Sequence, residues 1–111
     1  MNIEDLRKAL ENDVPVEYKM HCLKRMMERD ISRKDIIDSI KNGEIIENYP
    51  LSSDNTSENS FPSCLILSLR NKDMRPIHVV VGYNGKKIII ISVYYPDRER
   101  WYEDYKTRKE H

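Results

Sequence analysis

The dipeptide Asn84-Gly85 separates two segments with strong β-propensity, and it constrains the fold more than any other feature of the chain. Asn-Gly is the strongest short signal for a tight hairpin, because both residues tolerate the positive φ that such turns require. The flanking segments, 77–83 and 86–95, are rich in valine, isoleucine and tyrosine. We therefore predict two adjacent antiparallel strands, the second of them interior because its four consecutive isoleucines (88–91) suit a strand covered on both faces.

The rest of the chain predicts an α+β fold, with N-terminal helices packed on a roughly four-stranded antiparallel sheet and a C-terminal helix. Two more strands are expected at 44–49 and 62–69, separated by a polar loop at 50–60. Helices are expected at 2–11, capped by Asn2, at 18–29, and at 32–42. The last begins with a capping box of Ser32 and Asp35, and we expect Gly43 to end it as a left-handed C-cap. A final helix is expected at 98–109.

Length and composition indicate one domain. The 111 residues suit a single core, which we divide into an N-terminal extension helix (1–15), a core (16–101) and a helical tail (102–111). Nineteen basic and nineteen acidic residues give zero net charge, which excludes a generally basic nucleic-acid-binding protein. The start shows no signal peptide and the longest apolar run is far too short to span a membrane, so we expect a cytoplasmic protein.

The helix at 18–29 carries the first candidate site. His21, Arg25 and Arg29 are spaced four residues apart and share one face. An imidazole beside two guanidiniums can bind phosphate, since arginine presents a planar fork of donors to phosphate oxygens. The alternative is an ordinary solvated helix face.

His78 is the second candidate. Alternation in the segment 77–83 puts His78, Val80 and Gly82 on one face of the strand. A histidine among apolar residues is often a structural one, yet its pKa near neutrality also suits general acid–base catalysis. Sequence alone leaves both interpretations open.

The third candidate follows the last strand, at Tyr94, Tyr95 and Arg98. Aromatic side chains interleaved with basic ones, continuing to Trp101, suit stacking on unpaired bases. The alternative is that Trp101 docks the tail on the sheet. Three histidines and two widely separated cysteines make no recognisable metal site, so we expect neither a metal nor another cofactor.

Six blocks of the sequence resemble the DUF4258 family, in the family's order. They are 21–32, 43–50, 62–67, 78–82, 93–97 and Trp101, so the resemblance covers about 18–101. It implies a relation to RelE-like and barnase-like ribonuclease toxins, and a small zinc-finger antitoxin as a partner. The family's polar positions correspond to His21, Arg25, Arg29, His78, Ser92 and Tyr94 or Tyr95. The first helix and the long loop near 51–60 depart from the family pattern.

We therefore expect a metal-independent endoribonuclease, an mRNA-cleaving toxin of a bacterial toxin–antitoxin pair. Its catalytic candidates are His78, His21 and Tyr95, and its RNA-binding candidates are Arg25, Arg29, Tyr94 and Arg98. The alternative is a non-catalytic protein- or RNA-binding adaptor that uses the sheet edge and the tail, with both histidines structural. The first hypothesis requires that these side chains converge in one groove.

Overall fold

The computed structural model describes residues 1–50 and 61–109, so the loop expected at 50–60 lies, from residue 51 on, outside the described residues. The described residues form three helices and five strands. In chain order these are α1 (Ile3–Glu11), β1 (Val16–Tyr18), α2 (Met20–Arg29), α3 (Arg33–Asn42), β2 (Glu44–Tyr49), β3 (Ser63–Leu69), β4 (Pro76–Tyr83) and β5 (Ile88–Tyr94). None of these helices is long and apolar enough to cross a membrane.

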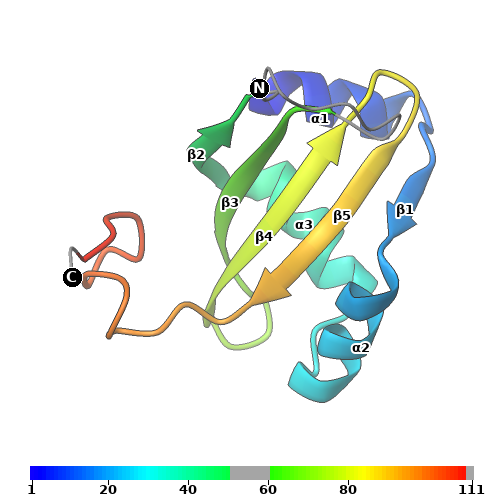
Figure 1. Cartoon of the computed structure of the whole chain (residues 1–111). Coiled ribbons are helices and arrows are strands. Elements are labelled where there is room, and N and C mark those ends of the chain that lie inside the picture. The colour runs from blue at the N-terminus through cyan, green and yellow to red at the C-terminus, as the bar shows by residue number, and fades with distance from the viewer. Residues whose placement is uncertain (51–60, 110–111) are drawn as a thin grey trace.

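The sheet of the described residues has five strands in the order β1-β5-β4-β3-β2 (Figure 1). The predicted β4–β5 hairpin is confirmed: Tyr83 pairs with Ile88, and Gly85 in the turn has a φ of 86°. The prediction of four antiparallel strands is wrong, because β1 adds a fifth that runs parallel to β5. This three-residue strand pairs with residues 72 positions away, and no turn motif in the sequence predicts such a pairing.

The helices pack on one face of the sheet (Figure 1). Their buried side chains, such as Cys22 and Ile36, form one core with Ile77, Val79 and Val81, which point to that face of β4. The predicted caps at Asn2 and of the Ser32–Asp35 capping box are both confirmed. The second helix begins at Met20 and not at 18, because Tyr18 belongs to β1.

The prediction that Gly43 is a left-handed C-cap is wrong. Gly43 has an extended backbone, with a φ of −86° and a ψ of −172°. A Cβ at this position would collide with the carbonyl oxygens of Ser39 and Leu67. Glycine is therefore needed where α3 turns directly into β2 and the two backbones approach closely. The left-handed C-cap belongs to α2, at Asp30, with a φ of 55°.

The C-terminal segment 97–109, here called the strap, is not a helix, so the predicted helix at 98–109 and helical tail at 102–111 are wrong within the described residues. The strap folds back on itself, with a bridge between Trp101 and Arg108. Asp97 and Asp104 accept backbone N–H groups locally, at 2.9 Å from Arg100 and 3.0 Å from Thr107. Such side-chain bonds compete with helix formation.

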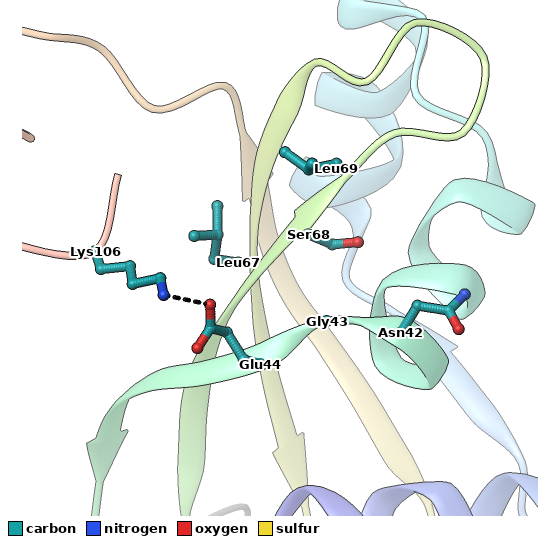
Figure 2. Close-up of a pocket in the computed structure, with 7 residues that line it drawn as sticks. All are labelled: Asn42, Gly43, Glu44, Leu67, Ser68, Leu69 and Lys106. Atoms are coloured by element: carbon teal, nitrogen blue, oxygen red, sulfur yellow. Dashed lines mark ion pairs between the residues drawn. The ribbon is translucent and has the colours of Figure 1, made fainter. Parts of the chain in front are cut away.

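Ion pairs tie the strap to the edge strand β2. The Lys106 amine lies 2.8 Å from Glu44, as Figure 2 shows. The Arg108 guanidinium donates to both carboxylate oxygens of Glu47, at 2.6 and 2.9 Å. Trp101, only 2% exposed, packs on the face of the sheet that the helices leave open. The strap thus covers part of that face and brings its own basic residues to the end of β5.

Candidate functional site

A cleft of about 410 Å³ lies where β5 ends, between α2 and the strap. Four of the described residues that line it are arginines. We call it the cationic cleft and define it by its lining: Arg25, Arg29, Ser92, Tyr94, Tyr95, Asp97, Arg100, Trp101 and Arg108. The predicted residues Arg25, Arg29, Tyr94 and Tyr95 therefore come together, as does Ser92.

The packing of α2 directs its two arginines into the cationic cleft. Cys22 and Met26 bury the opposite side of the helix against the sheet, and α2 contacts β5 along its length. Arg25 and Arg29 are one helical turn apart, so both guanidiniums lie on the same side. Arg29 also donates to the backbone oxygen of Val93 at 2.8 Å, which fixes its side chain against β5.

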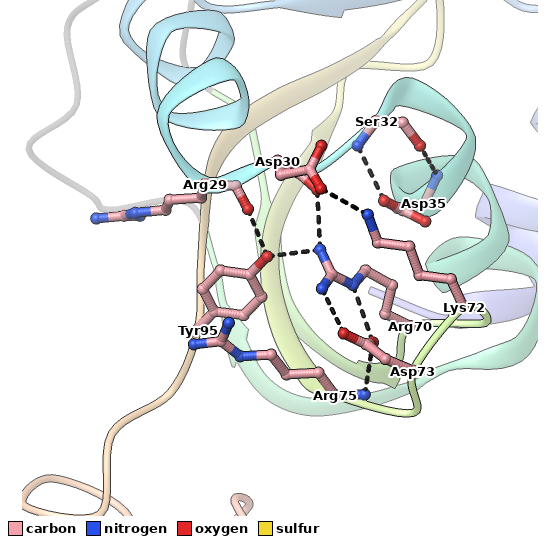
Figure 3. Close-up of polar contacts among 9 residues, drawn as sticks. All are labelled: Arg29, Asp30, Ser32, Asp35, Arg70, Lys72, Asp73, Arg75 and Tyr95. Atoms are coloured by element: carbon pink, nitrogen blue, oxygen red, sulfur yellow. Dashed lines mark hydrogen bonds and ion pairs between the residues drawn. The ribbon is translucent and has the colours of Figure 1, made fainter.

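Tyr95 is held by a polar network behind the cleft (Figure 3). Its hydroxyl donates to the backbone oxygen of Arg29 and accepts from Arg70 at 2.7 Å. Arg70 is 6% exposed, pairs with Asp73 and donates at 2.8 Å to the backbone oxygen of Asp30. The Arg75 guanidinium lies 3.5 Å from the centre of the Tyr95 ring. The network therefore caps the carbonyl end of α2 and positions the helix that carries Arg25 and Arg29.

Positive charge within this network lowers the pKa of Asp73. Hydrogen bonds from Arg70 and from the backbone of Arg75 lower the pKa of Asp73 to about 2. Asp73 is consequently ionised at neutral pH and keeps Arg70 oriented toward Tyr95 and α2. The hydroxyl of Tyr95 is hydrogen-bonded within this network and therefore positions α2. The tyrosine also lines the cleft.

Tyr94 lines the cleft and contacts a histidine beneath it. Its hydroxyl lies 3.2 Å from Nδ1 of His78, its direct partner across the β4–β5 pair. His78 is fully buried, and its Nε2 lies 2.8 Å from the backbone oxygen of Tyr105 in the strap. Trp101 packs edge-on against the imidazole, with ring centres 4.5 Å apart. Burial lowers the pKa of His78 and raises the pKa of Tyr94, so both are neutral at neutral pH.

Arg108 reaches the cleft from the strap while bound to Glu47. The hydrogen bond from Arg108 lowers the pKa of Glu47, so this pair is ionised. The Arg108 guanidinium also lies 4.6 Å from the centre of the Trp101 ring, which holds it over the aromatic floor of the cleft. The lining holds four arginines and one carboxylate, that of Asp97, so the cleft is cationic in a protein of zero net charge.

Three predicted site residues are not among the lining residues of the cleft: His78, which is fully buried behind Tyr94, and the exposed residues His21 and Arg98. His21 is exposed in the first turn of α2. Arg98 is exposed and pairs with Glu103 at 3.4 Å. Arg108 and the network of Arg70 were not predicted, and Arg100 was expected only as part of a basic and aromatic segment. The composition of the C-terminal segment could not show where that segment folds back, and no local pattern marked Arg70.

Among the residues that the structure describes, no three histidine, cysteine, aspartate or glutamate side chains gather in a group that could hold a metal ion. A family model described as "Domain of unknown function (DUF4258)" matches residues 18–95. No curated protein and no solved structure matches the chain. The match ends before the strap, so Arg100, Trp101 and Arg108 complete the cationic cleft from outside the matched segment.

Proposed function

The chain belongs to the DUF4258 family, and we propose that it is an endoribonuclease that binds single-stranded RNA in the cationic cleft and cleaves it without a metal ion. The observation that carries this proposal is the convergence of four arginines and three aromatic side chains, among them Tyr94, in the lining of one cleft. The contributing residues come from α2, β5 and the strap, so no single sequence motif contains them all.

The lining of the cleft suits a phosphodiester backbone with unpaired bases. Arginine forks bind phosphate oxygens in pairs, and phosphate contacts supply most of the affinity for a nucleic acid. Tyr94, Tyr95 and Trp101 add ring surface beside these cations. Aromatic side chains among arginines are typical of surfaces that hold single strands, since every base has a face on which a ring can stack.

Cleavage without a metal needs a group that accepts the proton of the ribose 2′-hydroxyl and cations that stabilise the growing charge on phosphate. The arginines of the cleft meet the second need. Tyr94 supports the first, since this residue lines the cleft and its hydroxyl contacts an imidazole. Attack of the 2′-oxygen would leave a 2′,3′-cyclic phosphate and a free 5′-hydroxyl.

The cellular part of the proposal is a cytoplasmic toxin that cleaves mRNA and is neutralised by a cognate antitoxin. The resemblance stated for the sequence supports this role. Induced expression in a bacterium should arrest growth and shorten RNA lifetimes, and co-expression of a neighbouring antitoxin gene should restore growth. Normal growth at high expression of the folded protein would contradict the toxin role.

The alternative is a non-catalytic RNA-binding adaptor. One observation favours it: His78 is sealed beneath Trp101, and His21 lies outside the lining of the cleft, so no imidazole faces the cleft within the described residues. An adaptor would need the arginines and the aromatic rings but not the Tyr94 hydroxyl.

A cleavage and binding assay separates the two functions. Purified protein is incubated in EDTA with a single-stranded RNA and with DNA of the same sequence. We expect cleavage of the RNA only, to 2′,3′-cyclic phosphate ends, because the reaction needs the 2′-hydroxyl. Tight RNA binding with no cleavage would establish the adaptor, and activity that EDTA abolishes and a metal restores would contradict metal independence.

Charge variants test the location of the site. Arg25→Gln and Arg100→Gln should each weaken RNA binding several-fold and reduce the slope of log affinity against log salt by about 0.7, the value for one lost phosphate contact on a single strand. Lys86→Gln is the matched control, since it removes one exposed positive charge from the β4–β5 turn, at the other end of β5 from the cleft. Equal effects of all three variants would show that binding is not confined to the cleft.

A further inference from the structure

We infer that His78 acts through Tyr94 as a buried proton acceptor, so that Tyr94, His78 and the Tyr105 backbone oxygen form one relay leading from the cationic cleft into the protein. This inference rests on the proposed function, which it deepens. The sequence is compatible with His78 either as a catalyst or as a structural histidine. The contacts of its two ring nitrogens indicate a third role, in which a residue sealed from substrate takes part in the chemistry.

The Tyr105 contact fixes which nitrogen of His78 carries the proton. A backbone oxygen can only accept a hydrogen bond, so Nε2 of His78, 2.8 Å away, must be the donor. A neutral imidazole carries one N–H, which leaves Nδ1 with a free lone pair. The Tyr94 hydroxyl at 3.2 Å therefore donates its proton to Nδ1. One lone pair of the Tyr94 oxygen consequently remains available to a proton arriving from the cleft.

The strap and its neighbours hold this arrangement. Tyr105 has a φ of 57°, a backbone conformation that is uncommon outside glycine and that turns its carbonyl toward His78. Trp101 covers the imidazole at right angles, with an interplanar angle of 89°. His78 has no exposed surface, so its Nδ1 meets the cleft through the oxygen of Tyr94.

The charged groups near His78 make it an acceptor that can hold a proton briefly. Burial lowers its pKa, which keeps the imidazole neutral before the reaction. The bond to Tyr105 and the negative charge of Glu47 on β2 act in the opposite direction and stabilise the imidazolium, while Arg108 on the strap opposes it. Glu47 and Arg108 pair with one another and act on the pKa of His78 in opposite directions.

During one cleavage, two protons move along the relay toward His78. The ribose 2′-oxygen forms a bond to phosphorus as its proton moves to the Tyr94 oxygen, and the phenolic proton of Tyr94 moves to Nδ1 of His78. The bond from phosphorus to the 5′-oxygen breaks, and that oxygen takes a proton from water. The imidazolium then returns its proton through Tyr94 to solvent, which regenerates the neutral pair with no net change in charge.

The variant His78→Gln tests the relay with little disturbance of its hydrogen bonds. The glutamine oxygen can accept from Tyr94 and its amide can donate to the Tyr105 oxygen, but it cannot accept a proton. We expect kcat/KM for RNA cleavage to fall about a hundredfold or more, with RNA affinity unchanged. The wild-type profile of kcat/KM against pH should fall on the acidic side, with an inflection below the usual pKa of histidine, and the variant should lack that inflection. His21→Gln is the matched control, since it makes the same substitution at an exposed histidine outside the lining of the cleft and should leave the rate unchanged.

Two results would overturn the relay. One is a His78→Gln protein that cleaves RNA at the wild-type rate with the same acidic limb. The other is a ¹⁵N spectrum of the free wild-type protein that shows the His78 proton on Nδ1, a measurement independent of activity. If wild-type protein does not cleave RNA at all, the proposed function itself fails. A different result overturns the relay alone: the wild type cleaves RNA, and the His78→Gln variant cleaves it equally well.

Discussion

At the scale of single residues, two buried polar side chains, His78 and Arg70, have hydrogen-bond partners at their polar atoms. His78 uses both ring nitrogens, and Arg70 bonds to Tyr95, Asp30 and Asp73. Burial without such bonds would cost several kcal/mol, roughly 2–7 for an amide-like group moved out of water. These two residues link segments that are distant in sequence, and both lie directly behind side chains that line the cationic cleft.

The lowered pKa of His78 predicts how stability depends on pH. The unfolded chain, in which His78 has its usual pKa of about 6.5, binds the proton more strongly than the folded protein does. Stability from this group is therefore complete above about pH 6.5 and is lost as the pH falls below it. Chemical denaturation between pH 7.5 and 5.5 should show a falling free energy of unfolding.

The variant His78→Gln provides the comparison, and its stability should change less over the same interval. Asp73, with a pKa of about 2, and Glu47, whose pKa is also lowered, lose their contributions only at more acidic pH, where unfolded carboxylates titrate. Identical pH dependence in the wild type and the variant would mean that His78 titrates alike in the folded and unfolded states.

At the scale of elements, the junctions decide the geometry of the site. The junction of α3 and β2 depends on Gly43, whose missing Cβ lets the helix end against the backbone of β3. The junction of α2 and α3 depends on Asp30 and on the Arg70 network. A shift at either junction would move α2 or β2, and with them Arg29 or the Glu47 anchor of the strap.

The variant Gly43→Ala should lower the free energy of unfolding by about 1–3 kcal/mol, the usual cost of forcing an extra group into a packed site. Gly43 has an extended backbone that alanine adopts freely, so the effect would report the collision alone. Gly85→Asn is the control, because its φ of 86° suits asparagine and a Cβ there meets open space. Thermal or denaturant unfolding measures both variants. A Gly43→Ala protein as stable as the control would show that α3 and β2 can separate without loss.

The features that sequence predicted correctly are local ones. The β4–β5 hairpin and the capping box of Ser32 and Asp35 each depend on residues only a few positions apart in the sequence. The spacing of Arg25 and Arg29 likewise predicted a shared face. The strand β1 and the fold-back of the strap depend on pairing with partners distant in sequence. The strap has a composition typical of a helix, but hydrogen bonds from its backbone to Asp97 and Asp104 favour turns instead. The burial of His78 followed from that missed fold-back.

At the scale of the whole molecule, charges that cancel in composition are separated in space. The N-terminal half contributes α2, and the C-terminal strap contributes Arg100 and Arg108. The cleft therefore forms only when both segments lie beside the end of β5. Local fields of this kind attract an anionic ligand although the net charge is zero. The proposed chemistry consequently depends on the hydroxyl of Tyr94, which joins the lining of the cleft to His78.

The most direct test is single-turnover cleavage of a single-stranded RNA in EDTA by wild-type protein and by Tyr94→Phe. The variant keeps the ring and removes only the hydroxyl, so RNA affinity should stay within about twofold, since stacking rather than the hydroxyl contributes to binding. The rate constant should fall about a hundredfold or more, the usual range for loss of a proton-transferring group. A Tyr94→Phe protein that cleaves at the wild-type rate would contradict the assignment of the chemistry to this cleft.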